Sequence, residues 1–158
     1  MASTQRNIAN AFLQSFEHLD TDANLALRAP GCVHSFAPAT LNMPASMTNE
    51  QWGAHLNSMK SILSTFPVEA KEIFEHEGST QVTVWATSNA VFREEAKDAE
   101  LGLDWNYQGE YIFVLVFNES GDKIERILEF LDSKKVLDFQ AQLKRARANV
   151  AARTEKHH

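Results

Sequence analysis

Two tyrosines and one glutamate have the types and spacing for acid–base chemistry in an enclosed pocket. Tyr107 and Tyr111 stand four residues apart in one predicted strand, so their side chains point to the same face of a sheet. Glu129 lies in the middle of the next predicted strand, within the apolar stretch 127–131. A carboxylate there needs hydrogen-bond donors, a cation or a proton, because burying it ionised and unpaired costs several kcal/mol. Tyrosine hydroxyls supply donors, and such a constellation suits general acid–base catalysis.

The hairpin between these two strands predicts which residues face each other. Its connection, Asn118–Asp122, fits a three-residue loop that ends on Gly121, because glycine takes the positive φ that this position needs. Counting back from this loop places Tyr111 directly opposite Glu129, about 5 Å away at Cβ. Gly109, between the two tyrosines, leaves room for a ligand or marks a bulge.

Helical segments are expected before the strands. A first helix is predicted over Thr4–Leu19 with Ser3 as its N-cap, and a short helical turn over 23–27. Thr48 opens a second long helix with a capping box, and Pro67 ends it. Between them, Ala29–Ser46 combines three prolines with apolar residues, which predicts an irregular, packed cover over a pocket.

After Pro67 the apolar period changes from 3.6 to 2, which predicts strands. Four are expected, near 68–75, 81–93, 105–117 and 123–131, with a solvated charged loop over 94–100 and a final helix from about Ser133. This order indicates the α+β class: one cone-shaped domain over residues 1–158, ordered from about 4 to 150, with a curled antiparallel sheet of about four strands, covered by the N-terminal helices.

The predicted sheet is apolar on both faces. One face of the third strand carries Tyr107, Tyr111 and Phe113, and the opposite face carries the alternating apolar residues of 112–116. The fourth strand likewise divides its apolar residues, with Ile124, Leu128 and Phe130 on the outer face. Such a sheet must be covered twice. Because helices cover one face, we expect a homodimer through the other.

Composition limits the classes of function. The chain has 158 residues, a formal charge of −6 and one cysteine. We expect no nucleic-acid partner, because that needs a basic face, and no membrane span, because no apolar run reaches about 18 residues. The N-terminus shows no signal-peptide pattern, so a cytoplasmic protein is expected. No metal-ligand spacing, glycine-rich phosphate loop or nucleophile elbow occurs, and we therefore expect no cofactor and no metal.

Three stretches resemble a known family. LRAPGCVHSFAP, VTVWATSNAVF and DWNYQGEYIFVLVFNESGDKIERILEFLDS look like a fungal SnoaL-like group of the nuclear-transport-factor-2-like superfamily. The resemblance covers most of residues 5–148. Members of the group are similar to isomerases of meroterpenoid and indole-alkaloid pathways, including the semipinacolase of brevianamide biosynthesis.

The resemblance implies a catalytic group. That semipinacolase is thought to use an arginine, two tyrosines four residues apart and a glutamate on the next strand, a pattern that Tyr107, Tyr111 and Glu129 match. Arg28 is carried over for the arginine, where it would stabilise developing negative charge. Further substrate contacts are expected from His34, His55, Trp85, Trp105 and Phe113. Ordinary core packing or interface contacts remain the alternative for the histidines and tryptophans.

The function expected from residues and resemblance together is a cofactor-independent isomerase or cyclase of fungal secondary metabolism. Its substrate would be a polycyclic or indole natural-product intermediate, rearranged in a semipinacol-type step within an apolar pocket. Two alternatives stay open. The same fold serves as a non-catalytic ligand-binding or dimeric interaction module. A dehydratase would need a second acid–base group near Glu129, for which His34 is the candidate.

Overall fold

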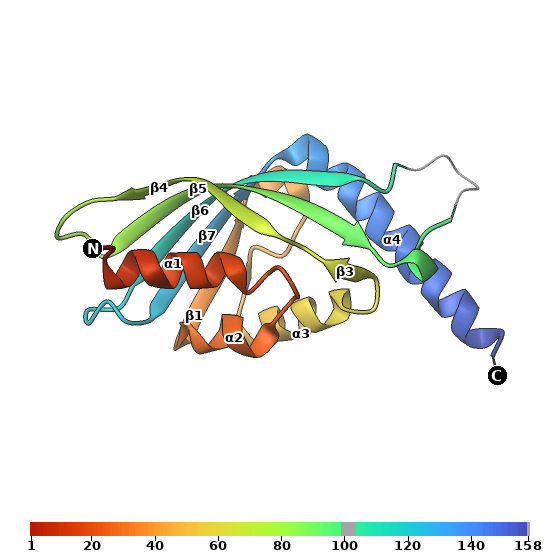
Figure 1. The fold of residues 1–158 in the computed structure, drawn as a ribbon, viewed down its shortest axis with the longest axis horizontal. Coiled ribbons are helices and arrows are strands. Elements are labelled where there is room, and N and C mark those ends of the chain that lie inside the picture. Colours follow the sequence, from red (N-terminus) through yellow and green to blue (C-terminus); the bar gives the residue numbers. More distant parts are fainter. Residues whose placement is uncertain (99–103, 158) are drawn as a thin grey trace.

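A strongly curved sheet forms the body of the protein, and helices gather on its inner side (Figure 1). The computed structural model describes residues 1–98 and 104–157. Its α-helices are α1 (Thr4–Gln14), α2 (Thr21–Ala26), α3 (Asn49–Met59) and α4 (Ser133–Glu155), and its 3-10 turns are η1 (Ala39–Leu41) and η2 (Glu94–Ala96). Its strands are β1 (Arg28–Ala37), β2 (Ser46–Met47), β3 (Leu63–Thr65), β4 (Val68–Glu75), β5 (Gln81–Phe92), β6 (Tyr107–Phe117) and β7 (Ile124–Leu131).

The strand order confirms the α+β class and corrects the size of the sheet. In the described part of the chain, seven strands join in the order β2-β1-β7-β6-β5-β3, with β4 also paired to β5. The four predicted strands correspond to β4–β7 and pair antiparallel. β1 was not expected. It runs parallel to β7, so the first strand of the chain lies beside the last.

The segment Ala29–Ser46 was predicted to be irregular, and most of this prediction is wrong. β1 takes up its first part, and Ser46 belongs to β2, which pairs with β1. Prolines and a register shift between Arg28 and Val33 hid this strand in the sequence. The start of β1 tolerates Pro30, since proline is accepted near sheet edges and bulges.

Both long helices were predicted too long. Ser3 caps α1 as expected, but α1 ends at Gln14, and the chain then turns through Leu19, which has a φ of 52°. The capping box of Thr48 and Gln51 is confirmed. α3 ends at Met59 rather than at Pro67, because the apolar residues that continued its pattern are buried from β3 and the loop that follows it.

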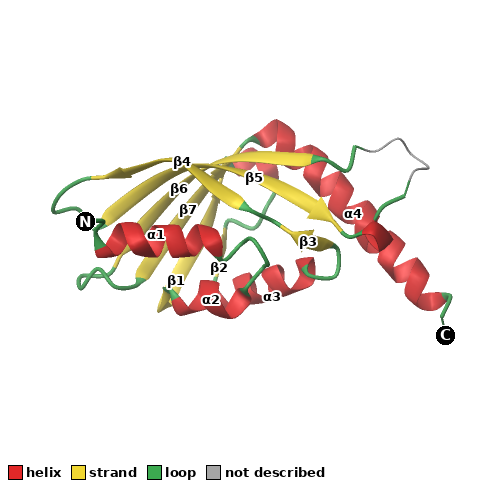
Figure 2. Ribbon diagram, in the orientation of Figure 1, coloured by secondary structure: helices red, strands yellow, loops and turns green. Residues whose placement is uncertain are grey.

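The helices close the concave side of the sheet. α1 packs against β4 and β5, α3 against β1, and α4 against β6 (Figure 2). Edge-to-face contacts of Phe12 with Phe16 and Phe113 join α1 to the centre of β6. The outer face of the sheet exposes large apolar side chains, among them Phe74, Trp85, Leu128 and Phe130.

Two further expectations concern loops and membranes. Of the predicted charged loop, η2 covers the first part, and residues 99–100 lie outside the described residues. Among the described residues, no helix is long and apolar enough to cross a membrane.

Candidate active site

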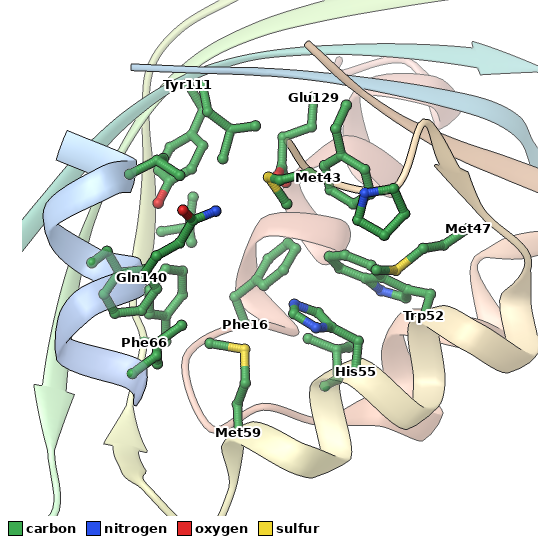
Figure 3. Close-up of a pocket in the computed structure, with 18 of the residues that line it drawn as sticks. Phe16, Met43, Met47, Trp52, His55, Met59, Phe66, Tyr111, Glu129 and Gln140 are labelled. Carbon is green, nitrogen blue, oxygen red and sulfur yellow. The ribbon is translucent and has the colours of Figure 1, made fainter. Parts of the chain in front are cut away.

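A cavity of about 320 Å³ lies between the inner face of the sheet and helices α3 and α4. Aromatic rings and methionines supply most of its wall, including Phe16, Phe66, Trp52, Met43, Met47 and Met59. Its polar lining is small: Glu129, Tyr107, Tyr111, His55, Gln140, Asn42 and Arg147. A mostly apolar pocket with a few placed polar groups is typical of sites that bind small organic molecules. In Figure 3, Tyr111 and Glu129 reach down from the sheet, and Trp52, His55 and Met59 rise from α3.

Glu129 lies on the inner face as predicted, but its cross-strand partner was predicted wrongly. Phe113 pairs with Glu129, and Tyr111 pairs with Leu131. The reason is the hairpin loop: Asn118 N–H donates to the Lys123 carbonyl, which makes the loop one residue longer than predicted. A register shift next to Phe117 adds a second residue. A slip of two preserves the face.

The same irregularity corrects Ile124. It was expected on the outer face, but it is fully buried. Ile124 pairs with Phe117, and the register shift lies between this pair and the next one, so Ile124 does not follow the alternation of the rest of β7. Gly121 does take the positive φ expected of the loop, at 72°.

The Glu129 side chain is largely shielded and faces the cavity. Only 6% of the residue is exposed. Among residues 1–98 and 104–157, no side chain or backbone group donates a hydrogen bond shorter than 3.5 Å to its carboxylate. Nε2 of His34 lies 3.6 Å from its Oε1. The expected bonds from the tyrosine hydroxyls to this carboxylate are therefore absent from the described structure.

The tyrosine hydroxyls instead bond to each other over Gly109. Tyr107 Oη and Tyr111 Oη lie 3.1 Å apart, and Ser88 Oγ lies 2.8 Å from Tyr111 Oη. A Cβ atom at position 109 would come within 3.0 Å of all three oxygens. The glycine therefore provides the space in which they meet. Three O–H groups joined by two hydrogen bonds leave one proton free to be donated to a further acceptor.

Burial keeps these hydroxyls protonated. It raises the pKa of Tyr107 to about 12, and it raises the pKa of Tyr111 well above 10. Both side chains are therefore hydrogen-bond donors at neutral pH and not bases. The hydroxyl pair is suited to bind an oxygen or nitrogen atom on which negative charge develops.

Arg28 and His34 lie behind Glu129 and do not line the cavity. Arg28 is 4% exposed, and its guanidinium lies over the rings of Phe12 and Trp52. His34 is fully buried and stacks on Trp52 at 4.0 Å between ring centroids. The structure thus places both beside the candidate acid, on the side away from the cavity.

The other expected contact residues divide into two groups. His55 and Phe113 line the cavity. Trp105 does not: its ring packs against Phe92, and its Nε1 donates to the Asp98 carbonyl at 2.9 Å. Trp85 is on the outer face of the sheet, so its expected place in the pocket is corrected. Trp85 shares its face of β5 with the polar residues Thr83 and Thr87, so the alternation of the strand already indicated the outer face.

Several lining residues were not predicted. Gln140, Leu143 and Arg147 lie on one face of α4, and their spacing of three and four residues was visible in the sequence. Trp52 was recognised only as a buried helix residue, yet it walls the cavity. Ser88, which contacts Tyr111 and is not part of the lining, was also not predicted. Its alternation with Ala86 and Ala90 of β5 was the only indication in the sequence that it faces inward.

The described residues contain no group of three or more His, Cys, Asp or Glu side chains arranged to hold a metal ion. Cys32 is a buried free thiol, and burial raises its pKa. It lies against Arg28, outside the cavity.

Comparison with known proteins places the chain among fungal biosynthetic proteins. Austinoid biosynthesis cluster protein H of Aspergillus calidoustus is 30% identical over 123 residues, which are 77% of this chain and 78% of that protein. The crystal structure of the BvnE pinacolase from Penicillium brevicompactum superposes with a TM-score of 0.76 at 22% identity, covering 91% of this chain and 96% of the pinacolase.

A bacterial protein has a similar fold. An NTF2-like protein of unknown function from Burkholderia pseudomallei has a TM-score of 0.66 at 11% identity and covers 86% of this chain and 96% of its own. No protein-family model matches the sequence. The solved structures show an NTF2-like fold, and the identity to the austinoid cluster protein leads to one assignment: this chain belongs to the family of the austinoid biosynthesis cluster proteins.

Proposed function

We propose that this chain is a cofactor-independent isomerase or cyclase of fungal secondary metabolism. Its substrate is a polycyclic or indole intermediate, and its reaction is an acid–base rearrangement of the semipinacol type. The observation that carries the proposal is Glu129, a carboxylate that faces an apolar cavity of about 320 Å³ without a short hydrogen bond from the described residues. A shielded carboxylate that lacks a hydrogen-bond donor from the protein is available to bind a polar group of the ligand.

In the proposed reaction, Glu129 takes the proton of a substrate hydroxyl. The electron pair of that O–H bond forms a carbonyl group while one C–C bond at the same carbon breaks. The migrating group carries its bonding pair to the adjacent, electron-poor carbon, and the pair displaced there moves onto a neighbouring oxygen or nitrogen. That atom receives a proton, so the product has the same atoms as the substrate.

The tyrosine pair serves the atom that gains electrons. Tyr107 and Tyr111 stay protonated at neutral pH, and their hydrogen-bonded chain has one proton to donate. Because Ser88 and the partner hydroxyl hold them in place before the substrate arrives, little reorganisation is needed during the reaction. The aromatic and methionine walls hold one conformer and thereby choose the migrating bond.

The test is to express the gene in a fungal host together with its chromosomal neighbours, and to compare metabolites with and without it by liquid chromatography and mass spectrometry. An isomerase yields a new product of unchanged mass, and Glu129→Gln abolishes that product. The intermediate that accumulates in its absence is then given to the purified protein.

Two alternatives predict other outcomes. A dehydratase gives a product lighter by one water. Its expected second acid–base group, His34, lies outside the cavity lining, whereas His55 lines the cavity and would have to take this role. A ligand-binding or interaction module leaves the metabolite pattern unchanged. If the purified protein binds the accumulated intermediate and never converts it, the isomerase proposal is wrong.

We also propose that the chain forms a homodimer through the outer face of the sheet. Its support is the exposure there of Trp85, Leu128 and Phe130, at 36%, 37% and 48%, on β5 and β7, the two strands that flank β6. Exposing such an apolar patch to water is unfavourable in free energy. In a two-fold symmetric dimer, the same patch of each subunit would cover the other. Light scattering after size exclusion should give a dimer for the wild type and a monomer for Phe130→Lys. Leu137→Lys, on exposed α4, is the control, and a monomeric wild type refutes the proposal.

A further inference from the structure

A chain of buried polar contacts runs behind Glu129, on the side away from the cavity. Asn24 is fully buried, and its Oδ1 accepts hydrogen bonds from Arg28 Nε and Trp52 Nε1, each at 2.9 Å. Arg28 Nη2 lies 3.1 Å from His34 Nδ1. On the other side of the same ring, His34 Nε2 lies 3.6 Å from the Glu129 carboxylate. The chain therefore links a guanidinium to the candidate acid through one imidazole.

The chemistry of these groups fixes where the imidazole proton sits. A guanidinium has donors and no acceptor, so His34 Nδ1 must accept from Arg28. Burial lowers the pKa of His34, which leaves one proton on the ring. That proton is on Nε2, the atom that faces Glu129 and has no hydrogen-bond partner within 3.5 Å among the described residues. Rings of Trp52 and Phe36, at 4.0 and 4.8 Å, hold the imidazole in its plane.

We infer that Arg28 and His34 are positioning residues that hold Glu129 as a carboxylate directed at the cavity, so that Glu129 acts first as a base. This inference rests on the proposed function and makes it more specific. The imidazole N–H faces the carboxylate from behind, and the guanidinium that bonds to Nδ1 fixes the ring in this orientation. Neither residue touches the substrate, since both lie outside the cavity lining.

Arg28 therefore differs from an arginine that contacts a substrate oxygen. Its burial lowers its pKa to about 10, which still leaves it cationic at neutral pH. Asn24, the two aromatic rings and Cys32 hold it where its charge acts on His34 and Glu129. The titratable groups that face Glu129 from the packed elements are Arg28 and His34 from β1, His55 from α3, and Tyr107 and Tyr111 from β6.

The first test needs no substrate. Nitrogen-15 correlation spectra of the histidine rings in the full chain report which nitrogen carries the proton, and the His34 signals are assigned by their loss in His34→Gln. The inference expects a neutral ring at neutral pH, protonated at Nε2 and bare at Nδ1. In Arg28→Met, the second tautomer or the imidazolium appears. A wild-type ring protonated at Nδ1, or charged, overturns the inference, whatever the protein's activity.

The second test uses the intermediate identified by the metabolite comparison. Arg28→Met should lower kcat by about tenfold or more, with KM nearly unchanged. Arg28→Lys should restore part of the wild-type kcat. His34→Gln keeps an amide donor near the position of Nε2 and should retain at least tenfold more activity than His34→Leu. Losses that follow thermal stability and change KM as much as kcat would show a purely structural role and refute the relay.

Discussion

Phe113 of β6 lies directly across from Glu129 of β7, and both side chains point to the inner face of the sheet. The acid therefore has an aromatic ring, and not a hydroxyl, as its cross-strand neighbour. Phe113 also contacts Phe12 and Phe16, so its ring cannot move aside easily. Because this packing fixes the Phe113 ring, the carboxylate points into the cavity. Tyr111 is the next inward-facing residue of β6, so the hydroxyl pair lies to one side of the acid and not directly across from it.

Replacing Glu129 by glutamine should abolish activity and lower stability to a small extent. The carboxylate receives no short hydrogen bond from the described residues, but its negative charge acts on the buried guanidinium of Arg28, and glutamine removes that charge. We expect a melting temperature slightly below that of the wild type, and a turnover at least about 100-fold lower. Thermal unfolding and product formation by the same preparations check both parts. A folded variant that keeps the wild-type turnover would contradict the role of the carboxylate.

Gly109→Ala should disable the tyrosine pair. The added methyl group would come within 3.0 Å of Tyr107 Oη, Tyr111 Oη and Ser88 Oγ, so at least one hydroxyl must leave its place. We expect a loss of about 1–3 kcal/mol in the free energy of unfolding and a larger relative loss in kcat than in KM. Gly31→Ala is the matched control, because nothing lies within 4 Å of its new methyl group. Equal effects of the two changes would argue against a special role for the glycine.

Two buried histidines predict a loss of stability in mild acid. Burial lowers the pKa of His34 and of His55 below 6.5, so the unfolded chain binds their protons more readily than the folded chain. Their contribution is fully present above pH 6.5 and is lost as the pH falls below it, with a slope of up to about 1.4 kcal/mol per pH unit for each ring. Urea unfolding at a series of pH values measures this slope.

His34→Gln should flatten that dependence by about one proton. The control is His76→Gln, which changes an exposed side chain and should leave the slope unchanged. The His34 contribution would be disproved if the wild type and His34→Gln lost stability in parallel between neutral pH and pH 5.

Arg147→Ala should weaken substrate binding more than it slows the chemical step. Its exposed side chain lines the cavity from α4. Contacts at such a rim act equally on the substrate and the transition state, so we expect a higher KM and a nearly constant kcat. Arg153→Ala, exposed on the same helix, should change neither value. Steady-state kinetics on the identified intermediate distinguish the two variants.

Local sequence patterns predicted the features that depend on residues close together in the chain, such as the face of a strand residue and the start of a helix. The spacing of Tyr107 and Tyr111 placed both on the inner face, and the capping residues Ser3 and Thr48 began their helices as expected. Pairing was harder. Residue types in the hairpin fit both a three-residue loop and the observed longer one, and this ambiguity together with the register shift next to Phe117 moved the partner of Glu129 by two positions.

Contacts between distant segments were not visible in the sequence. The approach of His34 to Glu129 depends on the parallel pairing of β1 with β7, and nothing in either segment specifies that partner. Parallel neighbours are joined by long connections, so their register is set by the whole fold rather than by a turn. Trp85 is a different case, because its alternation with Thr83 and Thr87 already indicated the outer face of β5.

The pairing of β1 with β7 also has a consequence for the order of folding. It joins the first strand of the chain to the last, so more than half of the chain forms a loop that must close before His34 and Glu129 meet. Closing such a loop is entropically unfavourable, and contacts of this range form late. During synthesis, β7 emerges only after every other strand. Helices and the β4–β6 meander can therefore assemble first, and His34 and Glu129 come together in the final step. A chain that ends before β7 can form part of the sheet but lacks Glu129.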